Sequence, residues 1–252
     1  MCAKQPDTVR RTATAAVAAL VVLSFVGIGA VGAGASDSEA AQVRVAHLSP
    51  DAPAVDVLVD GEAVLEDVEF GTVSEYLQLP ADEYQITIQT SEDEAVVFEG
   101  EVAVEAGTMY TIAAVGEVTE ETFEPAIYVD DFDVPSEDNA SVRLVHASPD
   151  APAVDVTVAE SGAVLYDNVT FSNATDYATV PAGDYTLEVR PATADNDGEV
   201  VATYNVSLQG GTVYSAVAAG YLMPEEAAGD APFDLLVVED ALSEEMMNTT
   251  EA

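Results

Sequence analysis

A phrase of fifteen residues occurs twice in this chain, and its duplication limits how the chain can be organised. The first copy spans residues 43–57 and reads VRVAHLSPDAPAVDV, and the second spans residues 142–156 and reads VRLVHASPDAPAVDV. The copies start about a hundred residues apart, whereas solenoid units repeat every roughly 20–50 residues. The phrase therefore indicates a duplicated domain. A chain of 252 residues has room for two domains that each bury a core.

The pattern of apolar residues predicts β-strands in both copies. Val43 and Val45 alternate with Arg44, which is the period of a strand. The two prolines of residues 49–53 cannot occupy a central strand, so this segment is predicted to be a rigid turn. Each copy continues with further short strands, about seven in all, separated by turn signals. This spacing predicts an all-β fold of two tandem immunoglobulin-like antiparallel β-sandwich domains.

The domain boundaries follow from the repeat and from changes in composition. They are a signal peptide or membrane anchor at 1–35, repeat 1 at 43–131, a linker at 132–141, repeat 2 at 142–240 and an acidic tail at 241–252.

A second repeated segment places a tyrosine at the start of a strand. It reads LPADEY at residues 79–84 and VPAGDY at residues 180–185. A turn followed by such a tyrosine is typical of the tyrosine corner, in which the phenol hydroxyl bonds back to the backbone of the preceding connection. We expect this role for Tyr84 and Tyr185, and the alternative is an ordinary half-buried strand tyrosine.

The charge of the chain excludes one class of partner. Asp and Glu number 47 against six Lys and Arg, which gives a formal net charge of −41. Hydrophobic residues make up 49% of the chain, so the acidic residues are expected to coat folded domains instead of forming a disordered chain. Such a surface repels phosphates, so no nucleic acid is expected as a partner. The balance is typical of a protein adapted to molar salt, and the alternative is an acidic calcium-binding surface.

The N-terminal 35 residues resemble an export signal. Lys4, Arg10 and Arg11 precede an apolar run over residues 13–35, which ends in an Ala-Gly-Ala cleavage motif. The run is also long enough to remain as an anchor, so N-terminal membrane association stays open. Cys2 is the only cysteine, and no internal disulfide is possible. We expect a secreted or cell-surface location, outside the cytoplasmic membrane.

The only two histidines occupy the same position in the two copies. Each is followed by a serine and two aspartates, namely Ser49, Asp51 and Asp56 after His47, and Ser148, Asp150 and Asp155 after His146. Histidine, serine and aspartate can form a hydrolytic triad. However, no nucleophile elbow or glycine-rich oxyanion loop surrounds either serine. We therefore expect the histidines to pin the Ser-Pro-Asp turn by hydrogen bonds, with a weak hydrolase as the alternative.

Metal binding has little support in the sequence. One histidine per domain cannot form a zinc site without carboxylates. Residues 195–198 read DNDG and resemble part of a calcium loop, but they lack its spaced ligands, so a hairpin turn is expected. Residues 130–133 are expected to be a solvated domain exit. No metal ligand and no cofactor is assigned.

Arginine is rare enough to be informative. After residue 35 the only basic residues are Arg44, Arg143 and Arg190. The first two stand at equivalent positions of the repeat, and each is expected to pair bidentately with a turn carboxylate of its own copy. The candidate partners are Asp51 and Asp56 in the first copy and Asp150 and Asp155 in the second. The alternative is simple inheritance through the duplication.

Asparagine falls almost entirely in N-x-[ST] sequons, the acceptors of N-glycosylation. Five of the six asparagines lie in one, and none of these lies in the first repeat. They are Asn139, Asn168, Asn173, Asn205 and Asn248.

The duplicated phrase, together with the later Pro-Ala-x-x-Tyr segment, resembles the domain-of-unknown-function family 4397 (DUF4397). The resemblance covers both repeats and implies a secreted or surface β-domain that often occurs in tandem, but it implies no activity. The acidity and the sequons look like a haloarchaeal member. We therefore expect a non-enzymatic, exported, glycosylated protein with a structural or adhesive role and a cell-envelope or carbohydrate partner. The alternatives are a carbohydrate- or calcium-binding module, or a hydrolase that uses His47 or His146.

Overall fold

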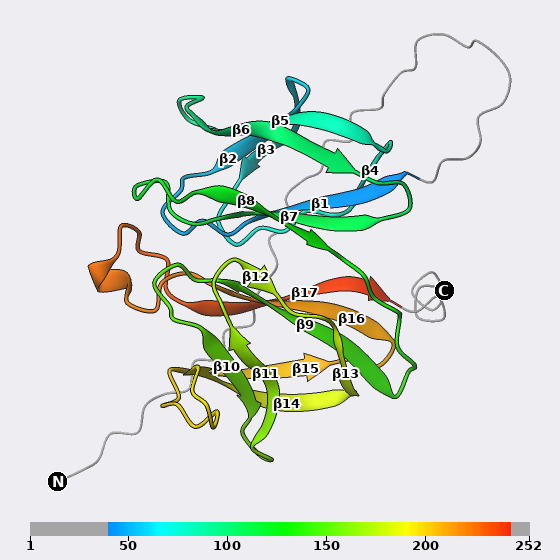
Figure 1. Cartoon of the computed structure of the whole chain (residues 1–252), viewed down its shortest axis with the longest axis vertical. Coiled ribbons are helices and arrows are strands. Elements are labelled where there is room, and N and C mark those ends of the chain that lie inside the picture. Colours follow the sequence, from blue (N-terminus) through cyan, green and yellow to red (C-terminus); the bar gives the residue numbers. More distant parts are fainter. Residues whose placement is uncertain (1–39, 243–252) are drawn as a thin grey trace, which may run out of the picture. The chain divides into compact units, whose positions relative to one another are not determined.

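A computed structural model describes residues 40–242, and the regular secondary structure of this part of the chain is almost entirely β-strand (Figure 1). The strands of repeat 1 are β1 (Ala41–His47), β2 (Val55–Val59), β3 (Glu62–Val68), β4 (Leu77–Leu79), β5 (Asp82–Thr90), β6 (Val96–Val104), β7 (Met109–Val115) and β8 (Glu124–Val129). The strands of repeat 2 are β9 (Asn139–Ala147), β10 (Val154–Val158), β11 (Ala163–Val169), β12 (Asn173–Ala174), β13 (Ala178–Pro181), β14 (Gly183–Pro191), β15 (Ala202–Leu208), β16 (Thr212–Ala219) and β17 (Asp234–Leu242). One short 3₁₀ helix, η1 (Pro224–Glu226), precedes β17. Between residues 40 and 242 no helix has the length and apolarity to span a membrane.

Each repeat forms two sheets that enclose a core, which confirms the predicted β-sandwich. In repeat 1 the sheets have the strand orders β4-β1-β7-β8 and β3-β2-β5-β6. In repeat 2 the orders are β12-β9-β16-β17, with β13 also paired to β9, and β11-β10-β14-β15. The inward residues alternate along the strands, as Ile86 and Ile88 do in β5 and Leu187 and Val189 do in β14.

The Ser-Pro-Asp segment is the point at which the chain crosses from one sheet to the other. It joins β1 to β2 in repeat 1 and β9 to β10 in repeat 2, and in each repeat these two strands belong to opposite sheets. Pro50 and Pro53 have no backbone N–H, so neither can continue the ladder of β1. The chain leaves β1 for the opposite sheet, so β1 and β2 do not form a hairpin. Strand β1 instead pairs in parallel with β7. Repeat 2 has the equivalent parallel pair, β9 with β16. These parallel pairs are an exception within the expected antiparallel sandwich.

The predicted domain boundaries shift by a few residues. Strand β1 begins at Ala41 and β9 at Asn139, so the linker ends before residue 139 and not at 141. Strand β17 extends to Leu242, because it stays paired with β16 up to Thr212, so the tail begins after 242 and not at 241. Each repeat also has more than the expected seven strands. The signal segment at 1–35 and the sequon at Asn248 lie outside the described residues.

The two repeats share a third apolar cluster, which the alternation of residues within one copy does not predict. It contains Ala46, Leu48, Ala113, Val115 and Tyr128 from repeat 1 and Val145, Ala147, Val217 and Ala219 from repeat 2. These residues lie on β1, β7, β8, β9 and β16 or directly after β1, on the faces opposite to the sandwich cores. The central strands are therefore buried on both faces, and the repeats belong to one compact unit.

Candidate functional site

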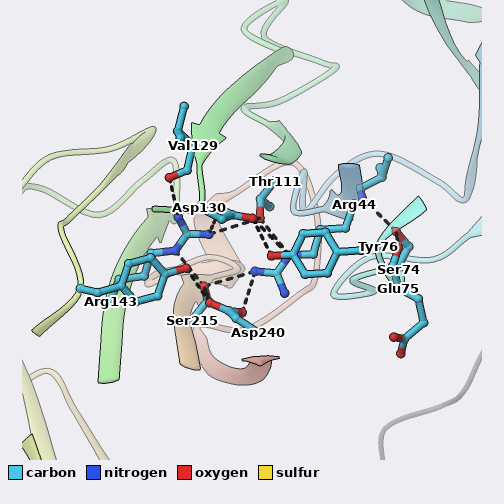
Figure 2. A network of polar contacts seen from close by, with 12 residues as sticks. Arg44, Ser74, Glu75, Tyr76, Thr111, Val129, Asp130, Arg143, Ser215 and Asp240 are labelled. Atoms are coloured by element: carbon cyan, nitrogen blue, oxygen red, sulfur yellow. Dashed lines mark hydrogen bonds and ion pairs between the residues drawn. The ribbon is translucent and has the colours of Figure 1, made fainter. Parts of the chain in front are cut away.

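The two repeated arginines lie at the contact between the repeats and are almost completely buried. Arg44 is 2% exposed and Arg143 is 1% exposed. Arg44 alternates with Val43 and Val45, which pack in the core of repeat 1, so its side chain leaves the other face of β1. Figure 2 shows the two guanidinium groups among polar side chains that come from both repeats.

Each arginine forms an ion pair with an aspartate of the other repeat. Nη2 of Arg44 lies 2.7 Å from Oδ1 of Asp240, in a contact whose angle is outside hydrogen-bond geometry. Nη2 of Arg143 donates to Oδ1 of Asp130 at 2.5 Å. Asp130 follows β8 of repeat 1, and Asp240 lies in β17 of repeat 2, so the two pairs cross between the repeats (Figure 2). Two buried positive charges are thus balanced by two buried negative charges, which is the condition for tolerating them in an interior.

Two hydroxyl groups connect the crossed pairs into one network. Nε of Arg44 donates to Oγ1 of Thr111 at 2.8 Å, and Thr111 donates to Oδ2 of Asp130 at 2.7 Å. The same chain exists in repeat 2, where Arg143 donates to Oγ of Ser215 at 2.8 Å and Ser215 donates to Oδ2 of Asp240 at 2.7 Å. Each arginine is therefore joined to the carboxylate of its own repeat through a hydroxyl and to that of the other repeat directly.

Two tyrosines complete the network and cover the arginines. The hydroxyl of Tyr76 donates to Asp130 at 2.6 Å, and that of Tyr177 donates to Asp240 at 2.7 Å. Their rings lie 4.8 Å from the guanidinium carbons of Arg44 and Arg143 respectively, which is cation–π geometry. Burial and the neighbouring carboxylate raise the pKa of both tyrosines far above 10, so they remain donors. Burial lowers the pKa of Arg44, but Asp240, Tyr76 and Asp130 outweigh it and the net direction is upward.

The expected partners of the arginines are wrong, because the turn carboxylates are already used. Asp51 accepts hydrogen bonds from the backbone N–H groups of Val118 and Thr119, both at 2.9 Å. Asp130, which was expected to be solvated, is 5% exposed. Only the docking of the two repeats brings Arg143 to Asp130, and no spacing within one copy predicts that.

The turn aspartates fasten a loop at the same end of each sandwich. Asp150 accepts from the N–H groups of Leu222 and Met223 at 2.8 and 2.7 Å, as Asp51 does from the β7–β8 loop in repeat 1. Burial raises the pKa of Asp51, but hydrogen bonds from Thr119, Val118 and Ser49 outweigh it, so the pKa lies below its usual value. The hydroxyl group of Ser49 donates to Asp51 at 3.3 Å, and Oγ of Ser148 lies 3.2 Å from Oδ1 of Asp150.

The last aspartate of the phrase supports a bulge in the neighbouring strand. Asp56 accepts from the N–H of Asp67 at 2.9 Å, and Asp155 accepts from that of Asn168 at 2.8 Å. Asp67 and Asn168 have φ angles of 56° and 52°, in the left-handed region. The carboxylates hold this local conformation, which costs free energy in a residue other than glycine.

Both histidines are fully buried and bonded to the backbone beyond the turn. Nε2 of His47 lies 3.0 Å from the carbonyl of Pro53, and Nε2 of His146 lies 3.0 Å from that of Pro152. A carbonyl only accepts, so Nε2 carries the proton and Nδ1 is unprotonated. Nδ1 of His47 is buried and has no hydrogen-bond partner among the described residues. Nδ1 of His146 accepts from the backbone N–H of Ser148 at 3.3 Å, while the Ser148 hydroxyl donates to Gly220 O at 2.6 Å. The serine hydroxyl is thus not paired with the imidazole, and burial lowers the pKa of both histidines.

The repeated tyrosines make the bond expected of a tyrosine corner. The hydroxyl of Tyr84 donates to the carbonyl of Pro80 at 2.9 Å, and that of Tyr185 donates to the carbonyl of Pro181 at 2.6 Å. A second pair was missed, since Tyr110 and Tyr214 accept backbone N–H groups of the preceding turn at 3.2 and 3.1 Å. Their equivalent positions in the two repeats are the feature of the sequence that could have predicted this role.

The DNDG loop closes on itself through hydrogen bonds. With its nitrogen turned toward the surrounding oxygens, the Asn196 amide donates to Thr193 O and Asp155 Oδ2 at 3.2 Å and to Asp167 Oδ1 at 2.6 Å. Within residues 40–242, no three His, Cys, Asp or Glu side chains are grouped as metal ligands. Of the sequon asparagines, Asn168, Asn173 and Asn205 are exposed and Asn139 is half-buried.

Three solved structures are similar to this chain at low identity. The Bacillus anthracis TIE protein is 10% identical, with a TM-score of 0.24 over 73% of this chain and 34% of that one, so the chain spans about a third of that protein. A family 41 carbohydrate-binding module from streptococcal virulence factors is 12% identical, with a TM-score of 0.23 over 70% and 92% of the two chains. The family 26 module of Eubacterium rectale Amy13K is 9% identical, with a TM-score of 0.24 over 81% and 98%.

Comparison with curated proteins finds no match. A family model, in contrast, matches nearly all of the described residues in two tandem segments, 41–157 and 157–250. The first segment contains both copies of the phrase, residues 43–57 and 142–156, and the second contains the later strands of repeat 2, including Asp240 of the network. The chain therefore belongs to the family described as Domain of unknown function (DUF4397).

Proposed function

We propose that this chain is an exported, non-enzymatic surface protein with a structural or adhesive role, adapted to high salt and carrying N-linked glycans. One observation carries the proposal. The polar side chains of the repeated phrase bind other parts of the protein itself, either fastening a turn or joining the two repeats. The repeated segment therefore serves to make the protein rigid. It presents no accessible histidine or activated serine that could act in catalysis.

The environment of the histidines supports the non-enzymatic part of the proposal. A general base needs an accessible nitrogen within reach of the proton that it removes. Both imidazoles are 0% exposed, and Nε2 of each faces a proline carbonyl. The neighbouring Ser148 hydroxyl donates to a backbone carbonyl, so it is not activated as a nucleophile.

The distribution of charge supports adaptation to salt. Of the three basic residues in the described part of the chain, Arg44 and Arg143 are buried in the network. Arg190 is partly exposed and pairs with Glu188 at 2.5 Å. The surface is therefore acidic with almost no compensating charge, and molar salt would screen its self-repulsion.

A carbohydrate-binding role has less support. Carbohydrate stacking needs an exposed aromatic ring, but the exposed large hydrophobic residues of the described chain are all aliphatic or methionine. The cavities in the two cores measure about 40 and 50 Å³ and are lined by apolar side chains, whereas ligand pockets are typically about 300–1,000 Å³. We therefore keep the structural or adhesive role as the proposal.

Protease shaving of intact cells at molar salt tests the location. The full chain is produced in a salt-requiring host with its N-terminal segment, and a cytoplasmic protein of the same cells is the control. We expect digestion or release of this chain while the control stays intact. Recovery of the chain only in the lysed cytoplasmic fraction would overturn the proposal. A hydrolytic activity abolished by His146→Gln without a change in unfolding free energy would overturn its non-enzymatic part.

A further inference from the structure

We propose that the folded chain directs N-glycosylation to Asn168 and Asn205 and withholds it from Asn139 and Asn173. The inference rests on the proposed export, since the sugar is added outside the cytoplasm. The four asparagines all lie in N-x-[ST] sequons, so the sequence alone does not separate them. The structure separates them by the accessibility of two groups, the amide nitrogen of the asparagine and the hydroxyl two residues later.

The reaction sets these two requirements. Nδ2 of the asparagine forms a bond to the anomeric carbon of a sugar carried on a lipid-linked phosphate donor. The bond from that carbon to the phosphate oxygen breaks, the lipid phosphate leaves with the electron pair, and the amide loses one proton. Because the sequon is defined by the hydroxyl as well as the amide, the transferring enzyme must reach both.

Asn205 satisfies both requirements. It lies in β15, an edge strand of the sheet β11-β10-β14-β15 (Figure 1), and it is exposed. Its Oδ1 accepts from the hydroxyl of Thr186 at 3.0 Å, so this bond uses the amide oxygen and not the amide nitrogen. Ser207, the hydroxyl residue of this sequon, is also exposed. An enzyme can approach the open edge without displacing a neighbouring strand.

Asn168 satisfies them through the bulge that Asp155 supports. Its backbone N–H is bonded to Asp155, and its φ of 52° turns the side chain out of the strand. Asn168 and Thr170 are both exposed, while Val169 between them is buried. The oxygen of the Thr170 hydroxyl accepts from Nδ2 of Asn173, but this bond does not use the hydroxyl proton, and the residue stays exposed. The backbone at this acceptor is thus fixed, and its side chain is presented to solvent at the end of β11.

Asn139 fails at the hydroxyl residue. Its Nδ2 donates to Oγ of Ser136 at 3.0 Å, and Ser141 is only 4% exposed. Ser141 lies in the central strand β9, paired with Thr179 of β13 on one side and with Val213 of β16 on the other. An enzyme could reach this hydroxyl only after β9 had separated from both neighbours.

Asn173 fails at both groups. Its Nδ2 donates to Oγ1 of Thr170 at 2.9 Å and to the carbonyl of Phe171 at 3.0 Å, so both amide hydrogens are used. The hydroxyl of Thr175 accepts from the N–H of Leu144 at 3.0 Å and donates to the carbonyl of Asp176 at 2.9 Å. This sequon is held against β9 although the asparagine itself is exposed.

The two favoured acceptors lie on one sheet, and it is the sheet that takes no part in the contact between the repeats. Asn168 and Asn205 belong to its two edge strands, β11 and β15. The shared apolar cluster and the crossed ion pairs use β9, β16 and β17 instead. Glycans at these positions would leave the contact undisturbed.

Site-resolved glycopeptide mass spectrometry of the exported full chain tests the inference. A protease that cleaves beside acidic residues generates the peptides, because arginine is too rare for trypsin. We expect occupancy at Asn168 and Asn205 at least about tenfold above that at Asn139 and Asn173, the ratio reflecting the open fraction of a locally folded segment. Thr170→Ala and Ser207→Ala should abolish occupancy at Asn168 and Asn205 respectively, whereas Thr170→Ser and Ser207→Thr should retain it.

The possible outcomes separate this inference from the proposed function. Equal occupancy of Asn139 and Asn205 would overturn the inference and indicate that the sugar is added before folding. Four unmodified asparagines in protein collected from outside the cell would also overturn it, while the proposed export would stand. Unmodified protein found only in the cytoplasm would overturn both.

Discussion

Replacing Asp240 with alanine should destabilise both repeats at once. Asp240 accepts from Ser215 and Tyr177 and is the ion-pair partner of Arg44. The side chain of Arg44 is only 3% exposed. Removal of Asp240 leaves its guanidinium group without the nearest negative charge. Breaking a buried ion pair by removing one partner costs about 3–5 kcal/mol. For a protein of this size each kcal/mol lowers the Tm by about 2–4 °C, so the expected shift is about 6–20 °C.

Calorimetry and chemical denaturation at constant molar salt measure this loss. Asp131→Ala is the matched control, because Asp131 is an exposed aspartate next to the network residue Asp130, and its removal should change stability by less than about 0.5 kcal/mol. Since Arg44 comes from repeat 1 and Asp240 from repeat 2, the variant should unfold in one transition at a lower temperature. An Asp240→Ala variant as stable as Asp131→Ala would refute the view that the crossed pairs hold the repeats together.

A double variant identifies the cause of the loss. Arg44→Met with Asp240→Leu removes both charges and refills the space with apolar atoms, which is often neutral for a buried pair. It should therefore be more stable than Asp240→Ala alone, with a coupling energy of about 0.5–3 kcal/mol. A double variant that loses the sum of the two single effects would show that packing, and not the uncompensated charge, causes the destabilisation.

Three further predictions follow from the turns and the surface. His146→Ala should lower the unfolding free energy by about 1–3 kcal/mol in denaturant titrations, because it leaves the Pro152 carbonyl and the Ser148 N–H without their partner; a variant as stable as the parent would count against the pinning role. Burial lowers the pKa of His47 and His146 in the folded state, so the unfolded chain binds more protons below its histidine pKa of about 6.5. The contribution of the histidines to stability at molar salt should be complete above about pH 6.5 and decrease as the pH falls below it, and a slope that is the same in a His47→Gln/His146→Gln variant would exclude the histidines as its source. Finally, the Tm should rise steeply between about 0.1 M and about 3 M NaCl as the Debye length shrinks, and a constant Tm would disprove the salt-screening account of the acidity.

The sequence was sufficient for the architecture of each repeat because the signals there are local. The alternation of Val43 and Val45 with Arg44, the prolines at the turn and the tyrosine in the first turn-proximal residues of β5 and β14 depend only on neighbours along the chain. These signals predicted the sandwich. The hydrogen bonds of His47 and His146 are local as well, because the carbonyls of Pro53 and Pro152 lie six residues further along the chain.

The contact between the repeats could not be read in this way, because its partners come from different copies. Each carboxylate that pairs with an arginine lies at the end of the other repeat, although Asp130 precedes Arg143 by only 13 residues. A signal was nevertheless present, since the strands at 109–115 and 212–219 are apolar on both faces, MYTIAAV and TVYSAVAA. A strand with one solvated face would alternate between apolar and charged or strongly polar residues. Runs that hold only apolar residues, tyrosine and small hydroxyl residues indicate burial on both sides. The equivalent positions of Asp130 and Asp240 at the ends of the last strands were the second signal.

The exchange of partners between Arg44 and Arg143 has a consequence for how many repeats can join in this manner. Each repeat offers the same patch to the other and receives the same patch in return, so the contact is isologous and closes on itself. A head-to-tail contact would leave a free patch at each end and permit an open-ended array. Here Asp130 and Asp240 are both consumed by a single pairing. A third copy of the domain could not add by the same contact. A substitution of either arginine would affect the stability of the other repeat as well as that of its own.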